Sequence, residues 1–202
     1  MLTNFEKALG FRLEAFNYLY VLCDYETLLK KNISLEQFVL LCKKKDVKIV
    51  QYRDKISSNE IQIKNLLYLK ANLEIPIIVN DKIDLIEYAD GLHVGQEDLE
   101  KVHKDKALAV KLIRLKIKDK LLGLSTHNEK EILEANTFSL DMIGLGAYKN
   151  TSTKDVSTIL GDKISYLAKI SRHPVCAIGG VQIDDVIDNI KFNVVGSGFF
   201  NE

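Results

Sequence analysis

The chain has 202 residues, with 28 Lys and Arg against 28 Asp and Glu, and 47% of its residues are hydrophobic. This length predicts one domain with enough apolar residues for a core, and the composition excludes a disordered or fibrous chain. A net charge of zero argues against a globally basic nucleic-acid-binding protein. No apolar run approaches the ~18 residues that a membrane span needs. We therefore expect neither nucleic acid nor a membrane as a partner.

The first residues predict a helix. Thr3 and Glu6 have the spacing of a capping box, and apolar residues recur with helical period at Leu2, Phe5, Leu9, Leu13 and Phe16. We expect residues 1–16 to form a helical extension. Glu6 and Arg12 interrupt its apolar stretch, so it does not resemble a secretory signal.

Eight short apolar runs follow, and each has the length of a strand. Most are rich in Val, Ile and Leu without strict alternation, which is typical of strands covered on both faces. Amphipathic stretches with helix-start signals at Ser34, Ser57 and Asn128 lie between several of them. The predicted strands cover residues 18–24, 47–53, 76–81, 90–96, 121–127, 141–147, 174–180 and 192–198.

Eight alternating strands and helices predict a TIM (β/α)8 barrel, in the α/β class, rather than an open doubly wound sheet. No linker-like segment interrupts the sequence, so we expect a single domain over residues 1–202. Because the eighth predicted strand ends near Glu202, we expect the barrel to lack its final helix. We expect the N-terminal helix, or a partner subunit in a homo-oligomer, to cover the seam between the eighth and first strands.

The cysteines indicate the redox environment. Cys23, Cys42 and Cys176 are far apart and odd in number, which offers neither a disulfide framework nor a CxxC site. A reducing compartment fits best, so we expect a cytoplasmic protein.

Polar and ionisable residues collect where the predicted strands end, and in a (β/α)8 barrel these ends share the rim on which active sites are built. Arg53, Lys55 and Lys154 are cations on this rim. Glycines follow the seventh and eighth strands at Gly179, Gly180, Gly196 and Gly198, where barrels commonly hold phosphate. The sequence therefore predicts an anionic, phosphorylated ligand.

Two carboxylates on adjacent strands, Asp81 and Asp98, are the candidate metal ligands. Mg²⁺ usually takes one or two protein carboxylates and completes its shell with water and phosphate oxygens. No His or Cys cluster has the spacing of a zinc site. Glycosidase chemistry is disfavoured because the nearby cations would keep both carboxylates ionised and leave no general acid.

The motifs in these segments, taken in order, resemble the thiamine phosphate synthases. They are QYRDK (51–55), PIIVND (76–81), DGLHVGQEDL (90–99), GLSTH (123–127), DMIGLG (141–146), TSTK (151–154), PVCAIGGV (174–181) and VGSGFF (195–200). The resemblance implies a (β/α)8 barrel transferase of thiamine biosynthesis. Such an enzyme joins 4-amino-5-hydroxymethyl-2-methylpyrimidine diphosphate to a thiazole phosphate and releases diphosphate.

The same resemblance implies residue roles. The pyrimidine diphosphate would contact Gln51, Arg53, Lys55, Asn80, Ser125 and Lys154, of which Arg53, Lys55, Ser125 and Lys154 would act in catalysis. Mg²⁺ would be held by Asp81 and Asp98. The thiazole phosphate would be received by Thr151, Thr153, Gly179 or Gly180, Gly196 and Ser197.

Two other functions stay open at this point. The thiazole tautomerases, relatives of the synthases, use a histidine after the fifth strand, where His127 stands; we expect His127 to neighbour the diphosphate instead. A non-catalytic barrel that binds a phosphorylated ligand is the third reading. The basis for this third reading is the segment AYKN, which has Lys149 and Asn150 where the synthases commonly have an aromatic residue and a proline. We interpret His93 as a barrel-interior histidine rather than a base.

Overall fold

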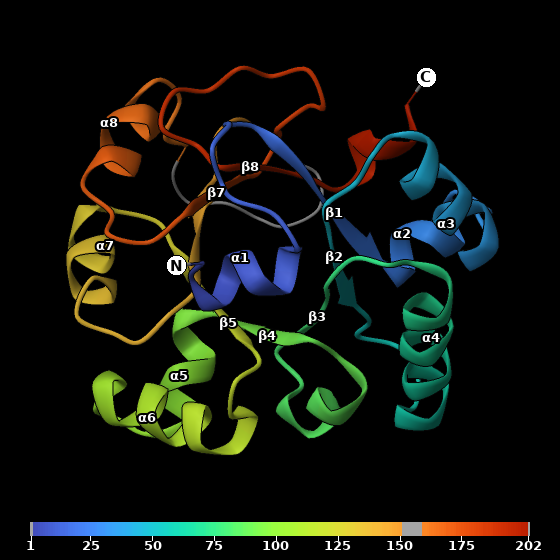
Figure 1. The fold of residues 1–202 in the computed structure, drawn as a ribbon, viewed down its shortest axis with the longest axis horizontal. Coiled ribbons are helices and arrows are strands. Elements are labelled where there is room, and N and C mark those ends of the chain that lie inside the picture. Colours follow the sequence, from blue (N-terminus) through green and yellow to red (C-terminus); the bar gives the residue numbers. More distant parts are fainter. Residues whose placement is uncertain (1, 151–158, 202) are drawn as a thin grey trace.

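The computed structural model describes residues 2–150 and 159–201. Its eight strands form a closed parallel barrel in the order β1 to β8, which confirms the predicted fold class (Figure 1). The strands are β1 (Tyr18–Asp24), β2 (Ile49–Arg53), β3 (Ile77–Asn80), β4 (Gly91–Val94), β5 (Leu121–Thr126), β6 (Met142–Gly146), β7 (Val175–Ile178) and β8 (Phe192–Val195).

Helices cover the outside of the barrel. They are α2 (Tyr25–Lys30), α3 (Leu35–Lys44), α4 (Asn59–Asn72), α5 (Gln96–Val102), α6 (Lys106–Ile117), α7 (Glu129–Ala135) and α8 (Lys163–Lys169), with the 3₁₀ turns η1 (Ile83–Tyr88) and η2 (Ser197–Phe200). Among the described residues, no helix is long and apolar enough to cross a membrane.

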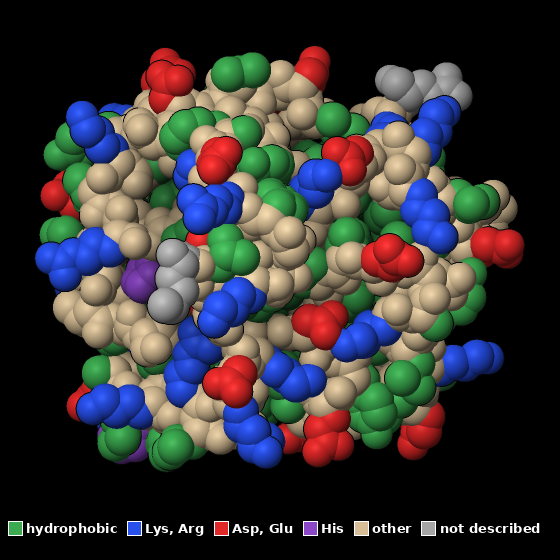
Figure 2. Space-filling view, viewed as in Figure 1, with side chains coloured by type: hydrophobic (Ala, Val, Ile, Leu, Met, Phe, Trp, Pro, Cys, Tyr) green, Lys and Arg blue, Asp and Glu red, His purple; other side chains and the backbone are tan. Residues whose placement is uncertain are grey.

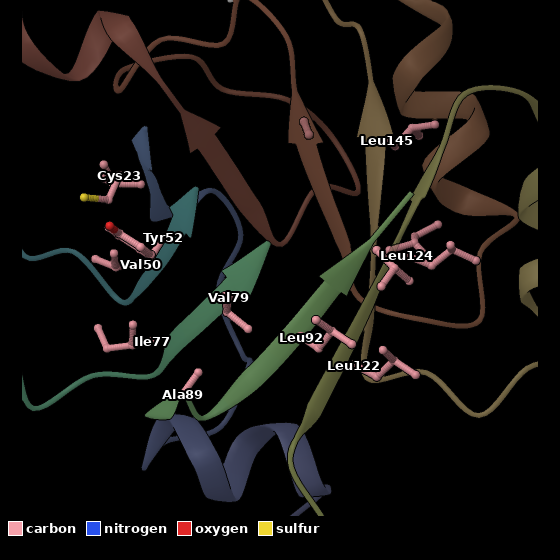
Figure 3. Packing of buried hydrophobic residues seen from close by; sticks show 14 of the residues in the cluster. Cys23, Val50, Tyr52, Ile77, Val79, Ala89, Leu92, Leu122, Leu124 and Leu145 are labelled. Atoms are coloured by element: carbon pink, nitrogen blue, oxygen red, sulfur yellow. The ribbon is translucent and has the colours of Figure 1, made fainter. Parts of the chain in front are cut away.

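The strands bury both faces. Their outward side chains belong to the main hydrophobic core, and Figure 3 shows Val50, Val79, Leu92 and Leu124 among them. In several strands the inward side chains change from apolar to polar along the strand. In β2, Ile49 lies in an apolar layer at the N-terminal end of the barrel, whereas Gln51 and Arg53 face a cavity at the other end. Every second side chain of a strand faces the barrel interior. The change of these interior side chains from apolar to polar explains why the apolar runs of the sequence end in polar residues.

The N-terminal helix differs from its prediction. The Thr3–Glu6 capping box forms, but α1 spans only Asn4–Leu9 because Gly10, at φ 78°, ends it. Gly10 adopts this left-handed conformation without steric cost. Residues 11–16 are not helical, and Phe16 is 52% exposed.

The prediction that the N-terminal helix covers the seam between β8 and β1 was wrong. Strands β1 and β8 pair directly, from Tyr18↔Phe192 to Val21↔Val195. Helix α1 instead lies across the N-terminal end of the barrel (Figure 1). Its Phe5, 2% exposed, packs in the apolar layer of the interior with its ring centroid 5.6 Å from that of Phe192. Figure 2 shows this closed end, where basic and acidic side chains are interspersed.

The outer surface near the seam is covered by turns. Phe199 of η2 is buried against Phe38 of α3, with ring centroids 5.9 Å apart. Contrary to the regular strand–helix alternation, residues 179–191 between β7 and β8 contain turns and no helix. In this segment Asn193 of β8 donates to the Asp185 carbonyl at 2.6 Å, so a strand side chain holds the loop in place of a helix.

Candidate active site

A cavity of about 880 Å³ opens at the C-terminal ends of the strands. It brings together the predicted residues that the structure describes, which come from six of the strand ends and their loops. They are Gln51, Arg53, Lys55, Asn80, Asp81, Asp98, Ser125, His127, Gly179, Gly180, Gly196 and Ser197. The predicted Thr151, Thr153 and Lys154 lie outside the described residues.

The end of β2 supplies two groups to the cavity, the guanidinium of Arg53, which Asp24 of β1 orients, and the amide of Gln51. Asp24 lies opposite Arg53 in the strand register and accepts a hydrogen bond from its guanidinium. Asp24 also caps α2 by accepting from the Thr27 N–H at 2.9 Å. Gln51 is 4% exposed, and its Nε2 has no hydrogen-bond partner in the described part of the chain. A buried donor without a partner is costly, so this amide is poised for a ligand acceptor.

The carboxyl groups of Asp81 and Asp98 lie within hydrogen-bond reach of each other. The pKa of Asp81 is raised to about 6 because the carboxylate is desolvated in the cavity and lies beside Asp98, although Lys55 partly opposes the shift. Burial works against ionisation of Asp98, but donation from Lys101 Nζ at 2.8 Å and from the Gly95 N–H at 3.2 Å holds its pKa below the usual range. Neighbouring carboxylates repel each other when both are ionised, so a proton or a nearby cation stabilises such a pair.

Ser125 at the end of β5 contacts a histidine of the neighbouring strand. His93 Nε2 lies 3.0 Å from Ser125 Oγ, and the buried Nδ1 has no partner among the described residues. Burial lowers the pKa of His93 to about 4, so the ring is neutral at pH 7. Glycine at 123 makes room for it, because a Cβ there would come within 2.4 Å of Nδ1. His93 thus lines the cavity as a neutral hydrogen-bonding group.

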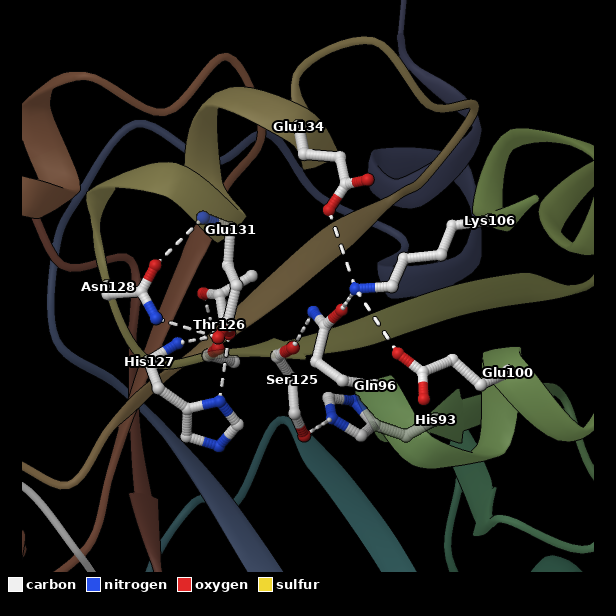
Figure 4. A network of polar contacts seen from close by, with 11 residues as sticks. His93, Gln96, Glu100, Lys106, Ser125, Thr126, His127, Asn128, Glu131 and Glu134 are labelled. Atoms are coloured by element: carbon white, nitrogen blue, oxygen red, sulfur yellow. Dashed lines mark hydrogen bonds and ion pairs between the residues drawn. The ribbon is translucent and has the colours of Figure 1, made fainter. Parts of the chain in front are cut away.

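His127 lies at the rim, beside the first turn of α7. Its Nδ1 and its backbone N–H each lie 2.9 Å from Glu131 Oε2, and Asn128 caps the same helix (Figure 4). The side chain of His127 is 44% exposed and lines the cavity. The contact with Glu131 fixes the orientation of the ring.

The loops after β6 and β7 form the other wall. Gly179 and Gly180 have φ values of +88° and +69°. A Cβ on Gly179 would lie 2.5 Å from the Ala147 Cβ, and one on Gly180 would lie 2.5 Å from the Asn150 carbonyl oxygen. Both conformation and close packing therefore require glycine. Of the AYKN segment, Ala147 and Asn150 line the cavity, whereas Lys149 pairs with Asp185 at 2.7 Å.

Comparison with known proteins identifies the chain. Residues 19–197 match the family model described as thiamine monophosphate synthase. The thiamine-phosphate synthase of Persephonella marina is 34% identical over 181 residues, which cover 86% of this chain and 81% of that protein. The enzyme of Clostridium acetobutylicum is 32% identical, with 88% of this chain and 82% of that protein covered. The chain belongs to the thiamine monophosphate synthase family.

A solved structure agrees with this assignment at the level of the fold. The thiamine phosphate pyrophosphorylase of Pyrococcus furiosus superposes with a TM-score of 0.69 at 20% identity, covering 90% of this chain and 87% of that one. The predicted family and barrel are therefore confirmed. A thiamine-phosphate synthase is a transferase, so the enzyme class expected from the motifs is confirmed as well.

Two residues that orient side chains of the cavity, Asp24 and Glu131, were not assigned roles from the sequence. Asp24 orients Arg53, and Glu131 orients His127. Asp24 carries a weak signal, since an aspartate three residues before Thr27 at the end of an apolar run is an N-cap pattern. Its contact with Arg53 depends on the β1–β2 register, which the sequence does not specify.

Proposed function

We propose that this cavity carries out thiamine phosphate synthesis, with Arg53 and Lys55 binding the diphosphate of the pyrimidine substrate. The observation that carries the proposal is the convergence of Gln51, Arg53, Lys55 and Ser125 on one cavity in a chain of this family. Because Arg53 is held by Asp24, its guanidinium is oriented before the substrate arrives. A preorganised cation is worth more to a developing negative charge than a mobile one.

In the proposed reaction, the bond from the pyrimidine methylene carbon to the diphosphate oxygen breaks, and its electron pair leaves with diphosphate. The thiazole nitrogen then attacks the methylene carbon and forms the new C–N bond. The negative charge on the departing diphosphate is what needs stabilising, and Arg53, Lys55 and Lys154 would share that task. Asn80 and Ser125 supply neutral hydrogen-bonding groups on the same wall. No protein nucleophile is required.

We propose Mg²⁺ as the cofactor, held by Asp81 and Asp98. Among the described residues, no group of three or more His, Cys, Asp or Glu side chains is placed to hold a metal. A pair of carboxylates fits Mg²⁺ nevertheless, since this ion takes few protein ligands and adds phosphate oxygens and water. The close approach of the two carboxyl groups favours a cation between them. When bound, Mg²⁺ would neutralise charge on the diphosphate.

We assign the thiazole phosphate to the wall of the cavity formed by Gly179, Gly180, Gly196 and Ser197. Thr151 and Thr153, which the family resemblance adds to this site, lie outside the described residues. Backbone N–H groups at glycine-rich strand ends are common phosphate ligands in barrels. The ion pair of Lys149 with Asp185 keeps that lysine from adding charge to this wall.

We propose that the protein is located in the cytoplasm. All three cysteines, Cys23, Cys42 and Cys176, are buried and free, which suits a reducing compartment.

The direct test is incubation with both substrates and Mg²⁺, followed by detection of thiamine phosphate and diphosphate. We expect both products in equal amounts. Interconversion of thiazole phosphate tautomers without formation of thiamine phosphate would favour an isomerase. The observation in favour of this second function is the contact of His127 with Glu131 at the cavity rim. Ligand binding without either reaction would favour a non-catalytic barrel. In the Asp81→Ala variant, we expect Mg²⁺ dependence and activity to be lost together; full activity would exclude Asp81 as a ligand.

A further inference from the structure

The loop after β4 is tied to the end of β5 by a side chain. The ladder between these strands ends at Val94↔Leu124, one residue before Ser125. Beyond it, Gln96 Nε2 donates to the Ser125 carbonyl at 2.7 Å. A backbone carbonyl in the wall of a barrel needs a donor. The Gln96 amide therefore continues the ladder by one step after β4 has ended.

Lys106, the first residue of α6, determines which way this amide faces. Its Nζ donates to Gln96 Oε1 at 2.9 Å. An ammonium group has donors only, so the amide oxygen must face Lys106 and the amide nitrogen must face Ser125. Lys106 is itself held between Glu134 at 3.6 Å and Glu100 at 3.8 Å, and its side chain is 20% exposed (Figure 4).

Ser125 is consequently fixed on two sides. Gln96 holds its carbonyl, and His93 contacts its hydroxyl at 3.0 Å. Ser125 and His93 line the cavity, whereas Gln96 and Lys106 are not among the described residues that do so. Gln96 therefore acts on the cavity indirectly, and its side chain reaches the cavity wall through the Ser125 carbonyl.

We propose that Gln96, oriented by Lys106, is a positioning residue that keeps the Ser125 hydroxyl directed at the pyrimidine diphosphate. The inference rests on the proposed function, because it takes Ser125 to contact that substrate. In this proposal the polar network of Figure 4 serves substrate binding. Glu100 and Glu134 hold Lys106, Lys106 orients the Gln96 amide, and that amide holds the end of β5.

The test begins with Gln96→Glu, which keeps the length and the contact with Lys106 but cannot donate to the Ser125 carbonyl. We expect the KM for the pyrimidine diphosphate to rise about tenfold, the factor that corresponds to one misplaced hydrogen bond. The melting temperature should fall slightly, because the Ser125 carbonyl loses its donor, but the KM for the thiazole phosphate should stay at its wild-type value. A general loss of structure would instead change both KM values.

Variants of Lys106 give a second measurement should Gln96→Glu fold poorly. Lys106→Met should raise the same KM, and Lys106→Arg, which still only donates, should restore it. The matched control is Lys116→Met, on the same helix, where the lysine pairs with Asp84 at 2.7 Å away from the cavity. It should behave as wild type.

The outcomes separate the two proposals. Absence of thiamine phosphate from the wild-type protein overturns the proposed function and this inference with it. Normal wild-type turnover with an unchanged pyrimidine KM in both Gln96→Glu and Lys106→Met overturns the inference alone.

Discussion

Asp24 and Arg53 form an ion pair across the first two strands, with side chains only 6% and 19% exposed. Asp24→Asn keeps an N-cap acceptor for α2 but removes the charge that orients the guanidinium. We expect kcat/KM for the pyrimidine diphosphate to fall about tenfold, because a charge-assisted hydrogen bond is lost at the cation that binds it. Steady-state kinetics would measure this. As a control, Asp46→Asn breaks the pair with Lys48, in which the Asp46 side chain is 83% exposed, and should have no effect. An unchanged kcat/KM in Asp24→Asn would show that Arg53 needs no orientation.

Lys149 and Asp185 join the loops after β6 and β7, with Nζ and Oδ1 2.7 Å apart. Asp185 also accepts from the Gln182 N–H at 2.8 Å, so the pair fixes the loop that follows Gly179 and Gly180. Because the Lys149 side chain is 47% exposed, the pair is weak. Lys149→Met should raise the KM for the thiazole phosphate about two- to fivefold. Lys149→Arg should retain the wild-type value, and a change confined to the pyrimidine KM would contradict this role.

His93 should make the fold sensitive to acid. Burial lowers its pKa from 6.5 to about 4, so the unfolded chain binds a proton between these values and the folded chain does not. The free energy of unfolding should therefore decrease as the pH falls from about 6.5 to 4, by up to about 3 kcal/mol. Chemical denaturation at several pH values measures it. His93→Gln should lose this part of the pH dependence, whereas His103→Gln, at an exposed position, should keep the wild-type profile.

Phe5 should stabilise the barrel without affecting its chemistry. Its ring fills the apolar layer at the end opposite the cavity. Phe5→Ala should lower the free energy of unfolding by about 3 kcal/mol, the cost of a large cavity in a core. Activity at a temperature where the variant is folded should match the wild type. Leu115→Ala, at a side chain 76% exposed, should cost less than about 0.5 kcal/mol. Deletion of residues 1–14 with an unchanged melting temperature would contradict a closing role for α1.

Much of this architecture could be predicted because strand and rim signals are local. Buried parallel strands are short apolar runs, and each runs into polar residues where it reaches the cavity, as Ile49, Gln51 and Arg53 do in β2. Since all eight ends meet on one rim, residues far apart in sequence could be assigned to one site before any distance was known.

The parts that could not be predicted depend on competing local bonds and on register. Residues 182–190 have the apolar content of a helix, but the Asp185 carbonyl, which a helix would bond internally, accepts from the Asn193 side chain. Likewise, nothing in the sequence specifies that Gln96 reaches the Ser125 carbonyl or that Asp24 lies opposite Arg53. Such contacts follow from how neighbouring strands are staggered.

Phe5 packs with Tyr20, Ile49 and Phe192 in the apolar layer at the N-terminal end of the barrel, so in the described part of the chain the cavity opens at the C-terminal end alone. Both substrates must arrive, and both products must depart, through the C-terminal opening. A molecule bound near the mouth therefore obstructs the exit of one bound more deeply. We expect the order of substrate entry and product release to be constrained by this geometry, so that product-inhibition patterns should be those of a sequential ordered reaction.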